Sequence, residues 1–369
     1  MRPLYIHERE DWPRFRWAGE RLAGVLAEVR YRQGRLTGHL VALGLPLRQE
    51  AQLKTLTEDV LGSSEIEGER LDAEQVRSSV ARRLGMEIGA LEPADRHVDG
   101  FVEIMIDATR QYDRPLTEER LFGWHAALFP TGRSGMRKIR VGAWRDESGD
   151  PMEVVSGPVG KERVRFEAPA AGRLPAEMTA FLDWFDRDSE TDPVLHAALA
   201  HLWFVTLHPF DDGNGRIGRA ILDMALARAD GEARRSYSMS RQIEQERRAY
   251  YGILEHTQKG SMDVTAYLVW FLECLLRAVD GTEDVIAAAL TKARFWKRHA
   301  REALNERQIQ MITRLLGDFK GKLTSSKWAK ISKCSQDTAV RDISDLVDRG
   351  ILDRNPGGGR STSYSLVLP

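Results

Sequence analysis

The sequence is poor in the features that mark a disulfide scaffold or a membrane protein. Its 369 residues include only two cysteines, Cys274 and Cys334, which lie far apart and form no metal-ligand spacing or disulfide framework. No apolar run reaches the length that spans a bilayer, and the first residues lack the apolar segment of a secretory signal. We therefore expect a protein of the reducing cytoplasm that does not associate with membranes.

An excess of charge of one sign is also missing. The chain carries 54 Lys and Arg against 55 Asp and Glu, a formal net charge of −1, so no overall basic field draws it to nucleic acid. Internal repeats and low-complexity segments are absent as well. With 42% hydrophobic and 30% charged residues, the composition is typical of a globular protein, and the length exceeds that of one ordinary domain.

Helical periodicity dominates what is present, so we expect a mainly α fold. It divides into a helical N-terminal region (1–95), a helical core (96–281), a connecting helix (282–303) and a C-terminal domain (304–369). The core is interrupted at 130–175 by Gly- and Pro-rich sequence whose β-type runs IRVGAW, MEVVSG and RVRFE predict a loop and a β-hairpin.

One helix start carries a specific signal. Asp72 and Gln75, three residues apart, predict a capping box at the beginning of a helix.

The stretch 207–220, LHPFDDGNGRIGRA, lies between two apolar runs and is dense in polar residues. Gly213 and Gly215 flank Asn214, and Gly is the residue most tolerant of positive φ, followed by Asn. Such a turn before a helix can aim successive backbone N–H groups at one point, which makes an anion-binding nest.

Charged side chains surround this turn. Arg216 and Arg219 share one helix face and can reach the same polyphosphate. Asp211 offers a hard oxygen ligand for Mg²⁺, and His208 can accept a proton near neutral pH. This set predicts a phosphoryl- or nucleotidyl-transfer site, against the alternative of a capping turn with surface arginines. The chain has no G-x-x-x-x-G-K-[ST] segment, so the site is not a P-loop.

Residues 208–219 resemble the HPFx(D/E)GNGRxxR-type signature of Fic domain proteins. The resemblance implies an all-α domain with a β-hairpin flap that transfers AMP from ATP to a protein hydroxyl. His208 would then be the base on a target Tyr, Thr or Ser, Asp211 would hold Mg²⁺, and Arg219 would hold the γ-phosphate. The implied ATP-binding residues are Gly213, Asn214, Gly215, Arg216, Ile217, Gly218 and Arg219.

The same resemblance assigns roles to a hairpin before the motif. Val154, Val155, Ser156 and Gly157 would belong to a flap that seats a target segment by strand addition. An ordinary surface hairpin is the alternative.

A segment after the motif resembles the adenine side of the family's site. Arg247, Tyr250 and Tyr251 fit its pattern, but Glu246 stands where Asn is usual. Helix packing by the two tyrosines is the alternative.

The segment GSSEIEGER places Ser63 and Glu67 four residues apart, hence on one helix face. It matches the (S/T)xxxE(G/N) inhibitory motif of Fic proteins. The resemblance implies that Glu67 pairs with Arg219 and occupies the space of the γ-phosphate, so that basal transfer is low. Two alternatives stay open: a solvated acidic helix face, or a Glu67 that orients water to remove AMP from targets.

The C-terminal domain resembles a winged helix-turn-helix, with three helices before a Gly-rich hairpin. From Lys322 to Arg360 it has eight basic and five acidic residues, a net charge of +3. DNA binding and protein docking are both open. The residues expected at a DNA surface are Lys322, Gln336, Asp337, Thr338, Arg341 and Arg360.

The leading hypothesis is a self-inhibited protein adenylyltransferase that uses ATP and Mg²⁺ and modifies another protein or itself. The alternatives are a deAMPylase and a nucleotide-sensing, DNA-binding regulator. A homodimer is expected by analogy with the family. The other histidines are predicted to be core or surface residues: His7, His39, His97, His125, His196, His201, His256 and His299.

Overall fold

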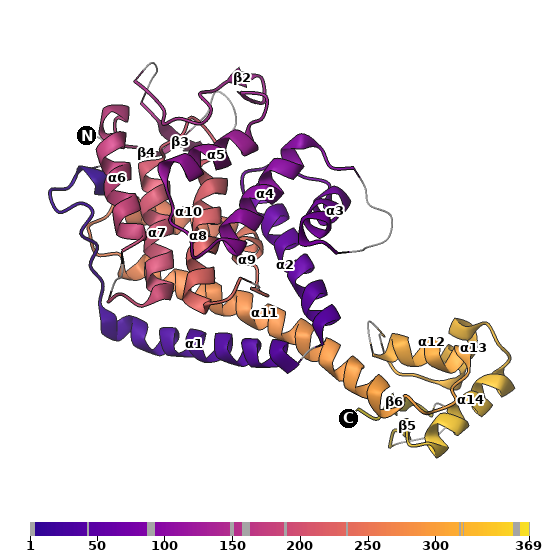
Figure 1. Ribbon diagram of the computed structural model, residues 1–369. Coiled ribbons are helices and arrows are strands. Elements are labelled where there is room, and N and C mark those ends of the chain that lie inside the picture. Colours follow the sequence, from indigo (N-terminus) through magenta and orange to yellow (C-terminus); the bar gives the residue numbers. More distant parts are fainter. Residues whose placement is uncertain are drawn as a thin grey trace. The chain divides into compact units, whose positions relative to one another are not determined.

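The computed structural model describes residues 4–42, 44–86, 93–147, 151–156, 163–187, 190–233, 235–316, 319, 321–356 and 362–368. It divides into two compact units, Met1–Thr282 and Glu283–Pro369. In the described part of the chain, helices dominate and the strands form small antiparallel hairpins (Figure 1). The predicted mainly α fold is confirmed.

The first unit contains most of the helices. They are η1 (Ile6–Glu8), α1 (Gly19–Ala42), α2 (Leu45–Ile66), α3 (Ala73–Leu84), α4 (Arg96–Arg110), α5 (Glu118–Leu128), η2 (Ala171–Arg173), α6 (Leu174–Phe185), α7 (Pro193–Leu207), α8 (Asn214–Asp230), α9 (Met239–Gln245), α10 (Arg247–Gln258) and α11 (Thr265–Arg298), which continues past residue 282. Its strands are β1 (Arg133–Ser134), β2 (Arg137–Lys138), β3 (Glu153–Ser156) and β4 (Arg163–Glu167).

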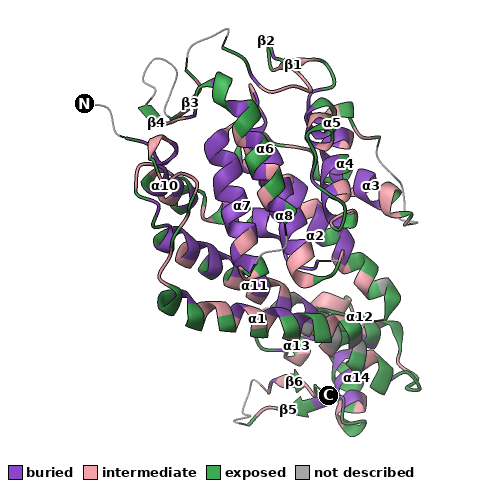
Figure 2. Cartoon of the chain, turned by 60° about the vertical axis from the view of Figure 1, so that its left-hand side comes forward, coloured by how far each residue is buried: buried purple, intermediate pink, exposed green. Residues whose placement is uncertain are grey.

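Helices α7 and α8 form the centre of the first unit. Helix α7 is apolar around most of its circumference, so it needs other helices around it to be stable, and Figure 2 shows it largely buried. A Cβ atom added to Gly218 on α8 would lie 3.0 Å from Val205 Cγ1 on α7, so glycine allows the two helices to pack closely. The loop between them carries the candidate site.

Helix α2 ends beside the first turn of α8. It packs so tightly on α9 that a Cβ atom on Gly62 would lie 2.9 Å from the Cα of Arg241. This contact fixes the last turn of α2, and with it Ser63 and Glu67, relative to the rest of the unit.

The β-hairpin predicted from MEVVSG and RVRFE is confirmed as β3 and β4, with a bulge between Val154 and Val155. The β-type run IRVGAW does not form a strand. A two-residue hairpin, β1–β2, precedes that segment, and Arg140 within it donates its backbone N–H to the Asp211 carboxylate of the site loop at 2.8 Å. Gly142 has a φ of +66° and donates its N–H to Nδ1 of His125 on α5 at 3.1 Å.

The capping box predicted at Asp72 is half correct. The Asp72 carboxylate accepts the N–H groups of Glu74 and Gln75 at 3.0 and 2.9 Å, as an N-cap should. The Gln75 side chain, however, accepts the N–H of Asp95 at 3.0 Å. This bond joins the start of α4 to α3, and it replaces the bond to the Asp72 backbone N–H that a capping box would have.

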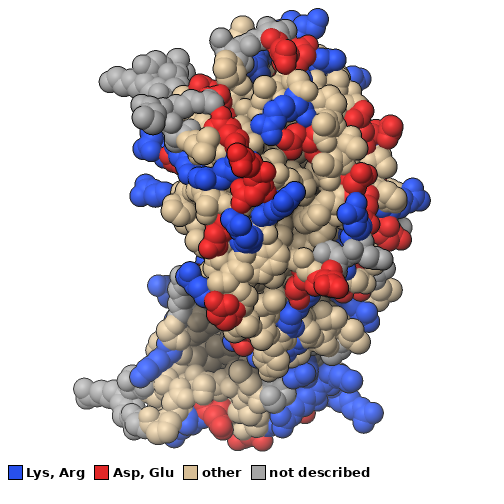
Figure 3. All heavy atoms as spheres, turned by 90° about the vertical axis from the view of Figure 1, so that its left-hand side faces the viewer, with Lys and Arg blue, Asp and Glu red and all other residues tan. Residues whose placement is uncertain are grey.

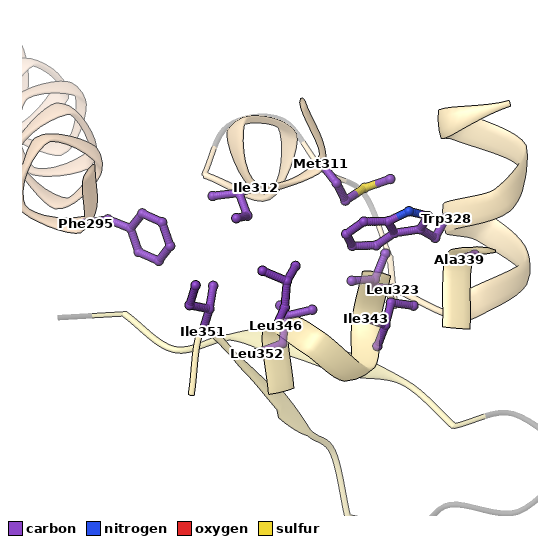
Figure 4. Packing of buried hydrophobic residues seen from close by; sticks show 10 residues of the cluster. All are labelled: Phe295, Met311, Ile312, Leu323, Trp328, Ala339, Ile343, Leu346, Ile351 and Leu352. Atoms are coloured by element: carbon purple, nitrogen blue, oxygen red, sulfur yellow. The ribbon is translucent and has the colours of Figure 1, made fainter. Parts of the chain in front are cut away.

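The second unit has its own core, shown in Figure 4, which extends from Phe295 to the fully buried Trp328. Its further elements are α12 (Glu306–Leu315), α13 (Ser325–Ser332), α14 (Gln336–Asp348), β5 (Leu352–Arg354) and β6 (Tyr364–Leu366). This order of elements is the one expected, but the winged-helix assignment stays a prediction. The connecting helix expected at 282–303 is the second half of a longer helix, α11, which begins at Thr265 and ends at Arg298.

The DNA contacts expected of residues in this unit also stay predictions. Gln336, Asp337 and Arg341 are exposed on α14, Thr338 is half-buried, Lys322 is exposed, and Arg360 lies outside the described residues.

The surface mixes charges of both signs, as Figure 3 shows for one face. Within the described ranges, no helix combines the length and the apolar character needed to cross a bilayer.

Candidate functional site

His208 ends helix α7 in the left-handed conformation, with φ 49° and ψ 56°. Its Nδ1 lies 3.3 Å from the carbonyl oxygen of Val205, which can only accept, so Nδ1 carries the ring proton and Nε2 keeps a lone pair. Burial lowers the pKa of His208 to about 4, and the Arg145 guanidinium acts in the same direction. The imidazole is therefore neutral at pH 7 and able to accept a proton.

Two side chains brace the loop that follows. Asn214 Oδ1 accepts the N–H of Phe210 at 2.9 Å, and Asn214 Nδ2 donates to the Phe210 carbonyl at 2.8 Å. The Phe210 ring stacks on His125 at a centroid distance of 4.2 Å. His125 in turn donates from Nε2 to the Asp212 carbonyl at 3.2 Å, since its Nδ1 accepts the Gly142 N–H. His125 is therefore a site-bracing residue that sequence reasoning placed only as core or surface.

The turn before α8 uses its residues differently from the prediction. Gly213 alone has a positive φ, 80°, and a Cβ atom there would lie 2.7 Å from Leu128 Cδ2. Asn214 is already the first helical residue. Because Ile217 donates to the Gly213 carbonyl, the N–H groups of residues 214–216 have no acceptor within the helix. They form the free N-terminal edge that an anion nest requires.

The two motif arginines are buried beside this edge. Arg219 is 1% exposed, and its Nη1 has no hydrogen-bond partner in the described part of the chain. That nitrogen lies 3.1 Å from the place a Cβ atom on Gly215 would take, so it faces the nest. Arg216 lies over the Phe129 ring at 5.2 Å, and its Nε is likewise without a described partner. Buried guanidinium nitrogens without partners fit a site built for phosphate oxygens.

The end of α2 closes over Arg219. Ser63 accepts from Arg219 through its hydroxyl at 2.7 Å and through its carbonyl at 2.8 Å. A Glu67 carboxylate oxygen lies 2.8 Å from Arg219 Nη2. A Cβ atom on Gly215 would lie 2.1 Å from the same carboxylate, which therefore stands directly in front of the nest.

A second carboxylate was not anticipated. Glu69 lies 2.8 Å from Arg216 Nη1 and 2.7 Å from His97 Nε2. The contact with His97 lowers the pKa of Glu69, and Arg216 contributes in the same direction. Glu67 and Glu69 thus engage one motif arginine each. The sequence signal for this second carboxylate was an acidic residue two positions after Glu67. Only the backbone turn at Gly68, with φ 84°, directs the side chains of Glu67 and Glu69 toward α8.

Two half-buried aspartates stand next to the nest. Asp211 accepts the backbone N–H of Arg140 at 2.8 Å through one carboxylate oxygen. Asp212 accepts the N–H of Gly213 at 2.6 Å, lies 4.0 Å from Arg216, and accepts a hydrogen bond from Ser134. Among the described residues, no group of three or more potential ligands forms a metal cage. A magnesium ion bound mainly by phosphates and water needs only one or two carboxylates, and this donor set fits it.

The residues expected on the adenine side lie beside the end of α2. Tyr250 is 2% exposed and its hydroxyl lies 2.9 Å from His201 Nε2. Tyr251 donates to the Ile66 carbonyl at 3.1 Å, and the exposed Arg247 lies over its ring at 5.8 Å. Their proposed contacts with adenine or ribose stay predictions.

Glu246, which departs from the family pattern at this position, binds Arg277 through two 2.6 Å hydrogen bonds.

The flap residues divide between the two faces of the hairpin. Val154 packs on the Tyr5 and Phe166 cluster, whereas Val155 is 49% exposed and pairs with Val164. Ser156 pairs with Arg163 through its backbone. Gly157 lies outside the described residues.

Comparison with known proteins agrees with this geometry. Residues 115–226 match the Fic/DOC family, and residues 5–86 match a domain of unknown function, DUF4172. Residues 115–226 therefore form a region of the Fic/DOC family, as the motif predicted.

Its curated relatives are named protein adenylyltransferase Fic. The protein of Drosophila willistoni is 33% identical over 114 residues, which are 30% of this chain and 21% of the relative. That of Nematostella vectensis is 33% identical over 115 residues, 31% of this chain and 25% of the relative. The match thus spans a quarter or less of those relatives.

Solved structures show the same fold. A Fic family protein from Desulfovibrio desulfuricans G20 superposes with a TM-score of 0.53 at 21% identity, covering 94% of this chain and 96% of that one. A Fic domain containing signaling protein from Bacteroides thetaiotaomicron has a TM-score of 0.50 at 21% identity, covering 68% of this chain and 94% of that one.

Proposed function

We propose that this protein transfers AMP from ATP to a hydroxyl group of a protein, another chain or itself. One observation carries the proposal: a neutral imidazole at His208 stands one loop away from a helix N-terminus flanked by two buried arginines with unpartnered nitrogens. The names of the curated relatives, protein adenylyltransferase Fic, support the same activity. Helical nests alone bind many anions, so the neighbouring base is what favours group transfer over simple binding.

The placement of these groups supports the following reaction. His208 Nε2 accepts the proton of the attacking hydroxyl, whose oxygen forms a bond to the α-phosphorus of ATP. The bond between that phosphorus and the β-phosphate bridging oxygen breaks, and pyrophosphate leaves. The N–H groups of residues 214–216 hold the phosphates, and Arg216 and Arg219 offset the negative charge that develops on the leaving group.

Mg²⁺ would neutralise the phosphates when bound. The carboxylate that we assign to it is Asp212, in place of the predicted Asp211. Asp212 is the residue directly before Gly213, the acidic position of the HPFx(D/E)GNGRxxR pattern, and it lies next to the nest and Arg216. Asp211 instead attaches residues 137–140 to the loop, since its carbonyl also accepts from Arg137 at 2.9 Å. Asp212→Asn should abolish the magnesium dependence of ATP binding, whereas Asp211→Asn should retain it.

In this proposal the protein restrains its own activity. The Glu67 carboxylate occupies Arg219 and the space in front of Gly215, and it repels a phosphate by like charge. Ser63 holds the same arginine through its Nε and Nη2 atoms. ATP would therefore bind without a free Arg219 until Glu67 moves away.

The test is mass spectrometry of the purified Glu67→Gly protein incubated with ATP, Mg²⁺ and cell lysate. We expect adenylate mass on protein hydroxyls and label from α-³²P ATP but not from γ-³²P ATP. The double variant Glu67→Gly, His208→Ala should still bind ATP and lose transfer by a factor of about 10² to 10⁴.

Three outcomes would contradict the proposal. Label from the γ-phosphate would indicate a kinase. Release of AMP from modified proteins by the wild type without any transfer by the variant would indicate a deAMPylase. Absence of both reactions would leave a nucleotide-sensing role for the core.

A further inference from the structure

Arg145 is a buried arginine next to the catalytic loop that no sequence motif marks. It is 7% exposed, and in the described part of the chain its side-chain hydrogen bonds go to backbone carbonyls. Nε donates to the His208 carbonyl at 2.9 Å, and Nη2 donates to the Leu207 carbonyl at 3.4 Å. Its backbone N–H donates to the Pro209 carbonyl at 2.9 Å. Three consecutive residues around the base thus bind one arginine.

The same guanidinium reaches the β3–β4 hairpin. Nη2 also donates to the carbonyl of Pro169, which follows β4. The hairpin register continues up to this point, because Ala168 donates to the Met152 carbonyl at 2.8 Å. Arg145 is therefore a direct hydrogen-bonded connection between the hairpin and the His208 backbone.

Burying a guanidinium group costs free energy unless nearby groups of opposite charge or hydrogen-bond acceptors stabilise it. Here the negative end of the α7 dipole and the last carbonyls of that helix receive the positive charge. Burial nevertheless lowers the pKa of Arg145 to about 10, which means that the surroundings disfavour the charged form. A neutral side chain would cost less free energy to bury here. A purely structural cap of α7 would not need a charge that also acts on the base.

We propose that Arg145 is a positioning residue that holds His208 in its left-handed conformation and keeps the β3–β4 hairpin in register with it. The fork geometry matters, since only a guanidinium donates to His208 and Pro169 in two directions at once. The base and the segment that would seat the acceptor hydroxyl then keep a constant separation. This inference rests on the proposed AMP transfer, but part of its test does not.

The kinetic test uses Arg145→Gln and Arg145→Lys in the Glu67→Gly background. A base displaced by about 1 Å costs roughly 10²-fold in rate, so we expect kcat to fall by about that factor while KM for ATP stays within about twofold. Lysine keeps the charge but not the fork and should recover only part of the loss.

Arg228→Gln is the matched control. Arg228 also binds carbonyl groups, those of Tyr112, Phe185 and Arg114, at the far end of α8. It should lower stability comparably and leave kcat unchanged. Equal loss of kcat in both variants, or an unchanged kcat in Arg145→Gln, would overturn the proposal.

A second readout needs no turnover and separates this inference from the proposed function. In protein with ¹³C-labelled histidine, Arg145→Gln should shift the His208 Cε1–H resonance and raise the pH at which it titrates. Arg228→Gln should leave both unchanged. If the Glu67→Gly parent transfers no AMP and the His208 resonance still responds to Arg145, the proposed function fails and the positioning role stands. An unaffected resonance overturns the role even in an active enzyme.

Discussion

The Glu67 carboxylate lies 2.8 Å from Nη2 of Arg219, and the same arginine keeps one nitrogen, Nη1, directed at the nest. One side of the arginine is thus occupied by Glu67, and the nitrogen on the other side is available to a ligand. Because the carboxylate also covers Gly215, its removal should both free the arginine and open the nest.

Glu67→Gly should therefore raise AMP transfer by at least about tenfold, a change equivalent to about 1.4 kcal/mol. The measurement is incorporation of label from α-³²P ATP into the purified protein or its targets. Glu65→Gly is the matched control, since Glu65 lies in the same helix end and pairs with Arg241 at 3.0 Å. Equal rates of AMP transfer for wild type and Glu67→Gly would refute inhibition by Glu67.

Glu69→Gln, added to Glu67→Gly, should tighten ATP binding about three- to tenfold. Glu69 holds Arg216 and places a negative charge near the phosphates, but it is 36% exposed and solvent weakens the effect. Calorimetric titration with ATP measures the change. Glu103→Gln, an exposed carboxylate on α4 paired with Arg83, should have no effect. Weaker ATP binding by Glu69→Gln would mean that Glu69 organises Arg216 for the ligand.

Gly213→Ala should lower the free energy of unfolding by about 2 to 4 kcal/mol and abolish transfer. The new methyl group combines left-handed backbone strain with a clash against Leu128 and Phe129. Gly231→Ala at the other end of α8 has φ 62° and no atom within 4 Å, so it should lose only about 1 kcal/mol. Urea unfolding of both variants tests this, and equal losses would contradict it.

His201 should make the protein sensitive to acid. Burial lowers its pKa to about 4, whereas an unfolded histidine titrates near 6.5. Between these values the unfolded chain binds a proton that the folded chain does not, so the stabilisation is complete above pH 6.5 and is lost toward pH 4. The difference in unfolding free energy between wild type and His201→Gln should therefore shrink as the pH falls from 6.5 to 4. A difference that stays constant with pH would refute the assignment.

Sequence alone predicted the helical class, which is confirmed, and the chemistry that we propose for the loop. Gly213, the two arginines and His208 lie within one dozen residues, so their relation follows from local geometry, and the family signature depends on the same proximity. The (S/T)xxxE(G/N) segment could be recognised for the same reason, although its contact with Arg219 could not be measured from spacing.

Only tertiary packing decided the rest. Asn214 braces Phe210 and does not form a second left-handed residue, because the α8 helix already begins there. The segment IRVGAW has strand propensity, but its backbone N–H groups bond to Asp211 in the site loop and to His125 on α5. Glu69 and Arg145 lack any motif, since their partners lie 147 and 63 positions away along the chain. Local sequence specifies groups that act together within one turn, whereas contacts over such separations exist only once the helices have packed.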